Sequence, residues 1–137
     1  MSQENVEVVR RGIAEYGLLS PTGAEEAARA GLVAPDAEWD FSAVYPDGPV
    51  LRGLESWRAY MDSLPWGRSL KVEPERFFDV GDERVLVFMR VTAEGEGSGV
   101  PVEMRNAHEF TIRDGVFVRW KGYADRTEAL EAAGLRE

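Results

Sequence analysis

Alternation of apolar and polar side chains near the C-terminus constrains the fold of this chain more than any other feature. Between residues 102 and 113 the even positions are mostly apolar and the odd positions mostly polar or charged. Successive side chains of a β-strand point to opposite faces, so the segment predicts a half-buried strand. Asn106 and His108 interrupt its apolar face, and His108 is the only histidine in the chain. Polar groups among apolar ones are typical of a small-molecule pocket.

The composition limits the classes of protein to which the chain can belong. Its 137 residues suit one domain, over residues 1–137, that is large enough to bury most of its apolar surface. Sixteen basic residues against 25 acidic ones give a net charge of −9, and there is no run of Lys or Arg. Nucleic-acid binding needs a basic surface, so we expect no nucleic-acid partner.

Metal, thiol and membrane chemistry are also disfavoured. The chain has no cysteine, which excludes disulfides, thiol nucleophiles and thiolate metal sites. Its acidic residues lack calcium-loop spacing and no Gly-rich phosphate loop precedes a helix, so we expect neither a metal nor a cofactor. No apolar run approaches the ~20 residues of a membrane helix, and the N-terminal residues lack a signal-peptide pattern. We therefore expect a cytoplasmic protein without membrane contact.

Helical spacing of apolar residues predicts helices over residues 3–17, 22–30 and 54–64, the last closed by Pro65. A final helix is expected from Asp125 to about Gly134. Two of the helices begin with a capping box, formed by Thr22 with Glu25 and by Asp125 with Glu128.

The strands are expected mainly in the second half of the chain. A short strand over 37–41 and a loop over 42–50 come first, followed by strands over 70–80, 84–93, 101–113 and 116–124. Asp114-Gly115 predicts a two-residue hairpin turn. The strand over 84–93 is apolar at nearly every position, which indicates cover on both faces. Three helices and a meander with one early strand predict an α+β fold.

Several segments together resemble the SnoaL-like branch of the nuclear transport factor 2 superfamily. They are ENVEVVRRGI, PDAEW, LRGLESWRAYM, VEPERFFDVGDERVLVFMRV and HEFTIRDGVFVRWKGYADRTEALEAAG. The resemblance implies an NTF2-like cone, in which three N-terminal helices pack on a strongly curved, mostly antiparallel sheet with a C-terminal helix. It also implies a cavity between these layers and a homodimer through the sheet. Members of the superfamily include isomerases, cyclases, epoxide hydrolases and binding modules, so fold leaves function open.

The resemblance also suggests three catalytic candidates. Ketosteroid isomerases place a pocket acid at about the position of His108 and an oxyanion-binding tyrosine near Tyr16. They also carry a carboxylate base on the first strand, where Asp40 is the candidate. Alternation turns Trp39 and Phe41 inward and Asp40 outward, unless a one-residue bulge reverses the strand. The alternatives are a neutral buried imidazole for His108 and a core position for Tyr16.

Other residues are candidates for ligand contact rather than catalysis. Asn106 should bond either to His108 or to a ligand, because burying an amide without partners costs ~1–3 kcal/mol. Arg90 either extends to solvent or forms an ion pair across the sheet. Asp125 suits the cap better than the catalytic aspartate that polyketide cyclases would require. The aromatic residues that line a cavity or form plain core are Trp39, Phe41, Trp57, Phe88, Phe110 and Trp120.

Three functions remain open. The first is a protein that binds a small apolar organic molecule in an enclosed pocket. The second is an isomerase or cyclase acting on a carbonyl compound, with His108 as acid/base and Tyr16 as oxyanion donor. The third is a dimerisation domain with a filled core. A cavity of at least ~300 Å³ at His108 argues against the third function, and a carboxylate within hydrogen-bond reach of the cavity favours the second.

Overall fold

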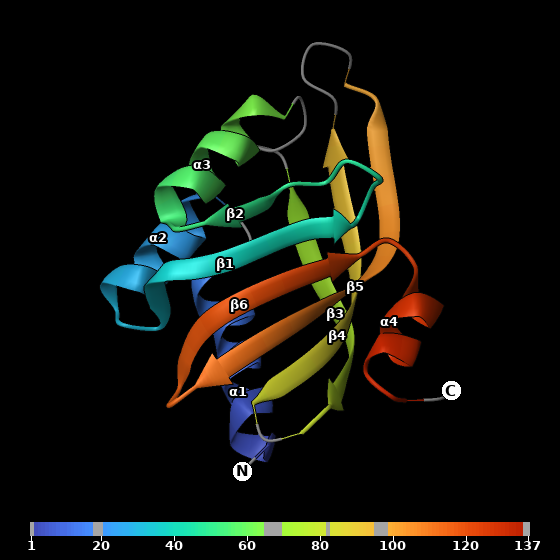
Figure 1. The fold of residues 1–137 in the computed structure, drawn as a ribbon. Coiled ribbons are helices and arrows are strands. Elements are labelled where there is room, and N and C mark those ends of the chain that lie inside the picture. Colours follow the sequence, from blue (N-terminus) through green and yellow to red (C-terminus); the bar gives the residue numbers. More distant parts are fainter. Residues whose placement is uncertain (1, 18–20, 65–69, 82, 95–98, 136–137) are drawn as a thin grey trace.

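One curved sheet organises the part of the chain that the computed structural model describes, which is residues 2–17, 21–64, 70–81, 83–94 and 99–135. Its six strands lie in the order β2-β1-β6-β5-β4-β3 (Figure 1). Their bounds are β1 Val33–Ala43, β2 Val50–Arg52, β3 Lys71–Asp79, β4 Arg84–Glu94, β5 Pro101–Arg113 and β6 Val116–Tyr123.

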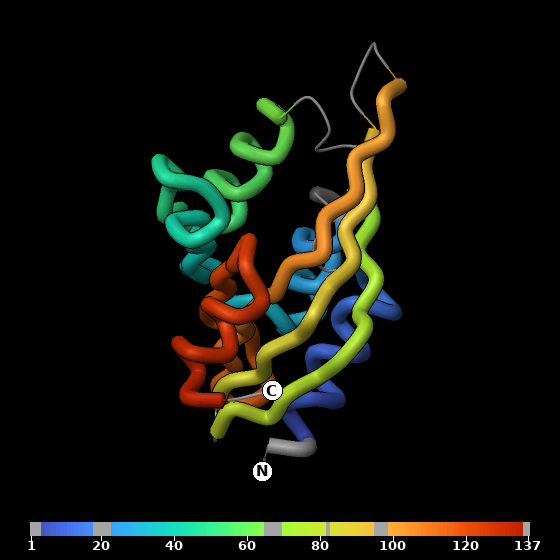
Figure 2. The backbone as a smooth tube through the Cα atoms, turned by 90° about the vertical axis from the view of Figure 1, so that its right-hand side faces the viewer, coloured from blue at the N-terminus to red at the C-terminus, as the bar shows by residue number. Residues whose placement is uncertain are grey.

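Helices cover both faces of this sheet. Their bounds are α1 Ser2–Tyr16, α2 Pro21–Arg29, α3 Leu54–Ser63 and α4 Arg126–Ala132. Buried residues of α1, α2 and α3 join one core with one face of the sheet, called the inner face here. Buried residues of α4 pack on the opposite, outer face. Figure 2 shows β3, β4 and β5 bending between these layers.

The predicted α+β fold is present, with one correction to its layout. Only α1 and α2 precede the sheet, whereas α3 follows β1 and β2 in the middle of the chain. The sheet is mostly antiparallel, but β1 pairs with β6 in parallel. The short strand β2 was not predicted: it pairs antiparallel with β1, from Glu38 opposite Arg52 to Asp40 opposite Val50. Prolines and a glycine between residues 45 and 50 favoured a plain loop there.

The termini of several elements agree with the sequence pattern. Asp114 and Gly115 both have positive φ angles, of 52° and 78°, as a two-residue hairpin turn requires. Asp125 caps α4 by accepting hydrogen bonds from the N–H groups of Thr127 at 2.7 Å and Glu128 at 3.3 Å. Helix α2 begins at Pro21, so Thr22 lies within the helix rather than before its first residue.

A few predicted features fall outside the described residues. These are the helix stop at Pro65 and the connections between predicted strands at Asp82, Gly95 and Gly97.

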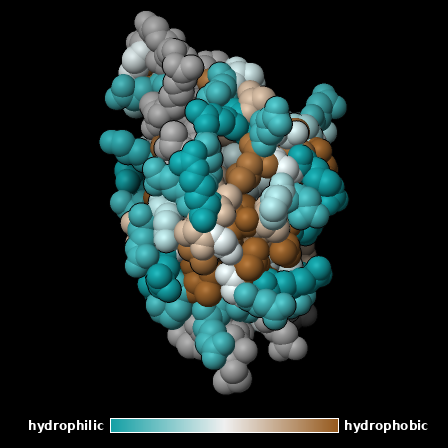
Figure 3. All heavy atoms as spheres, turned by 90° about the vertical axis from the view of Figure 1, so that its left-hand side faces the viewer, coloured by the Kyte–Doolittle hydropathy of each residue, from teal (hydrophilic) through white to brown (hydrophobic). Residues whose placement is uncertain are grey.

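The apolar strand β4 is covered on both faces, as its composition predicted. Val85, Val87 and Met89 join the inner core, and Leu86 and Phe88 lie beneath α4 on the outer face. The side of the molecule at the left of Figure 1 shows a band of apolar side chains down its middle, bordered by hydrophilic ones (Figure 3). In the described part of the chain, no helix is long and apolar enough to cross a membrane.

Candidate functional site

A small cavity lies between α3 and the inner face of the sheet. Its volume is about 60 Å³, room for about two water molecules at ~30 Å³ each. Its walls are mostly apolar and come from every strand except β2, from α3, and from the residues that follow β1 or precede β3. The lining residues are Phe41, Val44, Trp57, Met61, Leu70, Val72, Val91, Met104, Asn106, His108 and Trp120.

Asn106 and His108 are the polar residues of this lining. Because they lie two positions apart on β5, both side chains face inward, and they are only 8% and 5% exposed. Within the described residues, neither Asn106 Oδ1 nor His108 Nδ1 has a hydrogen-bond partner. Burial disfavours the charged imidazole and lowers the pKa of His108 to about 3. His108 is therefore a neutral hydrogen-bonding group at neutral pH.

Aromatic rings form the wall beside His108. The Trp120 ring meets the imidazole edge-on, with centroids 5.2 Å apart, and lies 4.8 Å from the Phe41 ring. Trp57, from α3, completes the group at 6.1 Å from Trp120. Gly122 makes room for this arrangement, since a Cβ there would approach the Trp120 ring to 2.6 Å.

Two other predicted ligand contacts lie behind this wall. Trp39 stacks on the Trp57 ring, and the two ring centroids lie 4.2 Å apart. Phe110 packs edge-on against Phe117 at 5.6 Å. Neither Trp39 nor Phe110 lines the cavity with His108, so both act here as core residues that support the wall.

The prediction that Phe88 lines the cavity is wrong. Phe88 lies on the outer face of β4, in the cluster that α4 covers, and its ring packs 4.8 Å from that of Phe78. Because nearly every position of β4 is apolar, the sequence carried no alternation to show which face Phe88 occupies.

Asp40 also lies on the outer face, as the alternation along β1 predicted. Its carboxylate accepts hydrogen bonds from the N–H of Ser42 at 2.8 Å, from the Ser42 hydroxyl at 2.6 Å and from Arg119 at 3.1 Å. Burial acts to raise the pKa of Asp40, but these hydrogen bonds and the charges of Lys121 and Arg119 outweigh it and hold the pKa below its usual value. The structure therefore does not bring Asp40 to His108.

Tyr16 is likewise separate from the cavity. It is the last residue of α1 and packs, half-buried, against the inner core. It does not line the cavity that holds His108. Among the described lining residues, His108 is thus the only titratable group.

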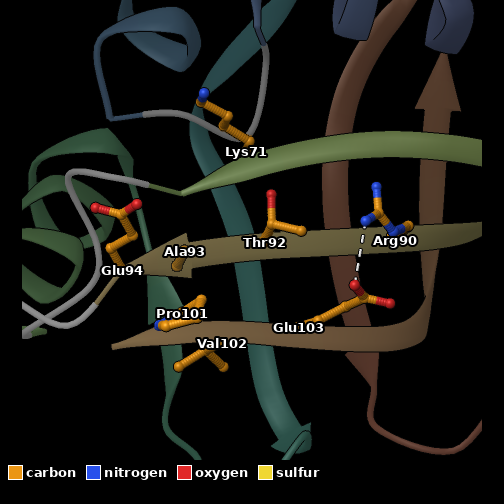
Figure 4. Close-up of a pocket in the computed structure, with 8 residues that line it drawn as sticks. All are labelled: Lys71, Arg90, Thr92, Ala93, Glu94, Pro101, Val102 and Glu103. Carbon is orange, nitrogen blue, oxygen red and sulfur yellow. Dashed lines mark hydrogen bonds and ion pairs between the residues drawn. The ribbon is translucent and has the colours of Figure 1, made fainter. Parts of the chain in front are cut away.

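A second, larger depression lies at the ends of β3, β4 and β5 (Figure 4). This groove has a volume of about 630 Å³ and shares no lining residue with the cavity at His108. Arg90 contributes to it from the outer face, where it donates to Glu103 at 3.1 Å and lies 3.9 Å from Glu73. Arg90 therefore forms cross-strand ion pairs, one of the two alternatives that the sequence left open.

The sequence interpretation missed several apolar lining residues. Met104 could have been found, since it shares the inner face of β5 with Asn106. Met61 follows the helical stripe of α3, but a stripe alone does not show which members reach a cavity. Among the described residues, no group of three or more His, Asp or Glu side chains could hold a metal ion.

The described residues form an α+β fold in which helices cover a curved six-stranded sheet. A family model for the SnoaL-like domain matches residues 22–120. The chain therefore belongs to the SnoaL-like domain family. No curated protein matches its sequence.

Solved structures show the same fold. A SnoaL-like polyketide cyclase from a Jannaschia species has a TM-score of 0.68 at 21% identity, over 98% of this chain and 94% of that one. The epoxide hydrolase/cyclase-like enzyme SalBIII has a TM-score of 0.68 at 15% identity, over 93% of this chain and 96% of its own. An NTF2-like protein from Burkholderia xenovorans has a TM-score of 0.63 at 25% identity, over 96% of this chain and 95% of that one.

Proposed function

We propose that this protein binds a small, largely apolar organic molecule at the cavity between α3 and the sheet. The observation that supports this function is the pair of unpartnered polar atoms, Asn106 Oδ1 and His108 Nδ1, on one side of an aromatic and aliphatic lining. A buried polar group without a partner costs ~1–3 kcal/mol. A ligand hydroxyl group would donate to Asn106 Oδ1 or bond to His108 Nδ1, whereas a carbonyl group would accept a hydrogen bond from His108 Nδ1–H alone.

The ligand enters by widening the cavity. At about 60 Å³ the present space is smaller than an aromatic ring needs. Met61 and Met104 line it, and methionine side chains are unbranched and adapt easily to new shapes. Their rotation would let a flat ring lie beside Trp57 and Trp120.

Binding is favoured over isomerase or cyclase chemistry by the titratable groups at the cavity. A general base works best with a pKa near the working pH, whereas the pKa of His108 is about 3. Tyr16 and Asp40, the other parts of the isomerase hypothesis, lie outside the lining. Two of the similar structures are named as cyclases, which leaves cyclase activity as the alternative. The small volume favours the third hypothesis, a dimerisation domain with a filled core.

Titration with phenol and benzene tests the proposal. The two probes share one ring, and only phenol carries a hydroxyl group. We expect phenol to bind about tenfold more tightly, because one buried hydrogen bond contributes about 1.4 kcal/mol. NMR chemical shifts of the Trp57 and Trp120 indole N–H groups locate the binding.

Variants of Asn106 and His108 show whether these two side chains cause the preference for phenol. Asn106→Leu and His108→Phe should each reduce the preference for phenol to within about twofold. Thr111→Val is the matched control, since Thr111 lies half-buried on the outer face of the same strand. Equal affinity of the parent protein for both probes, or no binding of either, would contradict the proposed function.

A further inference from the structure

Arg126, the first residue of α4, makes an unusual set of contacts on the outer face of the sheet. Its Nε donates to the backbone carbonyl of Asn106 at 3.1 Å, and its Nη2 donates to the backbone carbonyl of Met89 at 3.1 Å. Nη2 also bonds to the Glu75 carboxylate. The guanidinium carbon lies 4.6 Å from the centroid of the Phe88 ring. One side chain thus ties three strands together.

These contacts coincide with a place where the ladder of strand hydrogen bonds is interrupted. Met89 lies opposite Asn106 on β5 and opposite Pro74 on β3, and proline has no N–H to donate. The pairing of β3 with β4 shifts register between Pro74 and Arg76. On β5, Asn106 precedes Ala107, the first residue that pairs with β6. Arg126 supplies donors to backbone groups at this break.

The guanidinium is itself held by α4. Asp125 caps the helix immediately before Arg126. Ala129 and Leu130 of the same helix are buried against Leu86, Phe88 and neighbouring residues of the outer face. The Arg126 side chain is only 26% exposed. The packing of α4 on the sheet therefore determines the position of the Arg126 guanidinium.

We propose that Arg126 is a positioning residue for the cavity, which holds the backbone of Asn106 from the outer face so that the Asn106 carboxamide meets the ligand on the inner face. This inference rests on the binding function proposed above. It makes the C-terminal helix part of the binding site, although no residue of α4 lines the cavity.

The test compares Arg126→Gln and Arg126→Lys with the control Arg105→Gln. Arg105 is a suitable control because it has the same charge as Arg126 and bonds to the same Glu75 carboxylate, at 3.3 Å. It also lies next to Asn106 in the sequence. Its hydrogen bonds within the described residues go to carboxylates alone. A lysine at position 126 keeps the charge but lacks the planar fork that reaches several acceptors.

We expect both Arg126 variants to reduce the phenol-to-benzene affinity ratio from about tenfold to within about twofold, while benzene affinity changes less than about twofold. In the ligand-free protein, the NMR signals of the Asn106 side-chain amide should shift in both Arg126 variants and stay in place in Arg105→Gln. These readouts separate positioning from a general loss of stability.

Three results would overturn the inference while the parent protein still prefers phenol. They are an unchanged ratio in the Arg126 variants, the same loss in Arg105→Gln, and an equal loss of affinity for both probes. A parent protein without any preference for phenol would instead contradict the binding function, and the inference with it.

Discussion

At the scale of single residues, Asn106 and His108 each bury a polar atom without a partner among the described residues, as do the indole N–H groups of Trp57 and Trp120 in the same lining. Most buried polar atoms in proteins have a partner, so an exception calls for an explanation. A site awaiting a ligand is the explanation that also accounts for the aromatic lining. It predicts behaviour of His108 that differs from that of a surface histidine.

The stability of the protein should depend on pH through His108. Burial lowers the pKa of His108 to about 3, whereas an unfolded chain has a histidine pKa of about 6.5. Between these values the unfolded state binds more protons, so the free energy of unfolding falls as pH falls from about 6.5 towards 3. From about pH 7.5 to about pH 5 the parent should lose about 2 kcal/mol more than His108→Phe. Urea unfolding measures this difference, and parallel curves for the two proteins would refute a buried neutral imidazole.

Asp40 should matter for stability and leave binding unchanged. Asp40→Asn weakens hydrogen bonds with Ser42 and Arg119 on the outer face and should lower the free energy of unfolding at neutral pH by about 1 kcal/mol. Because the folded-state pKa of Asp40 lies below its usual value, this contribution is present above about pH 4 and is lost as pH falls through the folded-state value.

Denaturant unfolding and phenol titration check both parts of this expectation. The exposed turn residue Asp47 provides the control Asp47→Asn, which should change stability by less than about 0.5 kcal/mol. A marked loss of phenol affinity in Asp40→Asn would support the isomerase hypothesis instead.

At the scale of elements, α4 should depend on its cap. Asp125→Ala removes the acceptor for the Thr127 and Glu128 N–H groups and should lower the free energy of unfolding by about 1 kcal/mol. Thr127→Ala keeps the backbone donor and should have a smaller effect. Thermal unfolding distinguishes the two variants, and equal destabilisation would mean that the Asp125 cap is not what stabilises α4.

Elements whose apolar residues recur with a clear period could be predicted from the sequence. The same period showed on which face of the sheet their residues lie. Alternation along β5 and β1 correctly placed His108 and Asn106 inward and Asp40 outward. The faces of β4 were not predictable, because an unbroken apolar run has no period to read. Arg126 was missed for another reason: two of its partners are backbone carbonyls, which no side-chain pattern reveals.

The size of the cavity was beyond sequence reasoning altogether. The sequence predicted that the aromatic residues Phe41, Trp57 and Trp120 line a cavity or form plain core. They do both, because they line a cavity of only about 60 Å³ and otherwise pack against one another. That volume depends on how the rings pack, for example on Trp120 lying over Gly122. Residue types alone do not determine such packing.

At the scale of the whole molecule, a homodimer through the sheet stays a prediction. On the described outer face, the apolar residues of β4 lie beneath α4, and Glu109 interacts with Arg84 at 3.4 Å and Arg119 at 3.8 Å. A dimer through this face would have a polar interface. We expect the dimer at micromolar protein concentration. We also expect high salt to weaken it, because salt screens interactions between charged side chains. Light scattering measures the mass, and a monomer at low salt would contradict the prediction.

A crystal structure with 4-bromophenol shows whether the cavity between α3 and the sheet takes a ligand. Binding in the cavity should give bromine density beside Trp57 and Trp120, displaced Met61 or Met104 side chains, and a phenol oxygen about 2.5–3.2 Å from Asn106 Oδ1 or His108 Nδ1. Bromine only in the groove of Figure 4 or elsewhere on the surface, with the cavity still at about 60 Å³, would contradict it and favour a filled core.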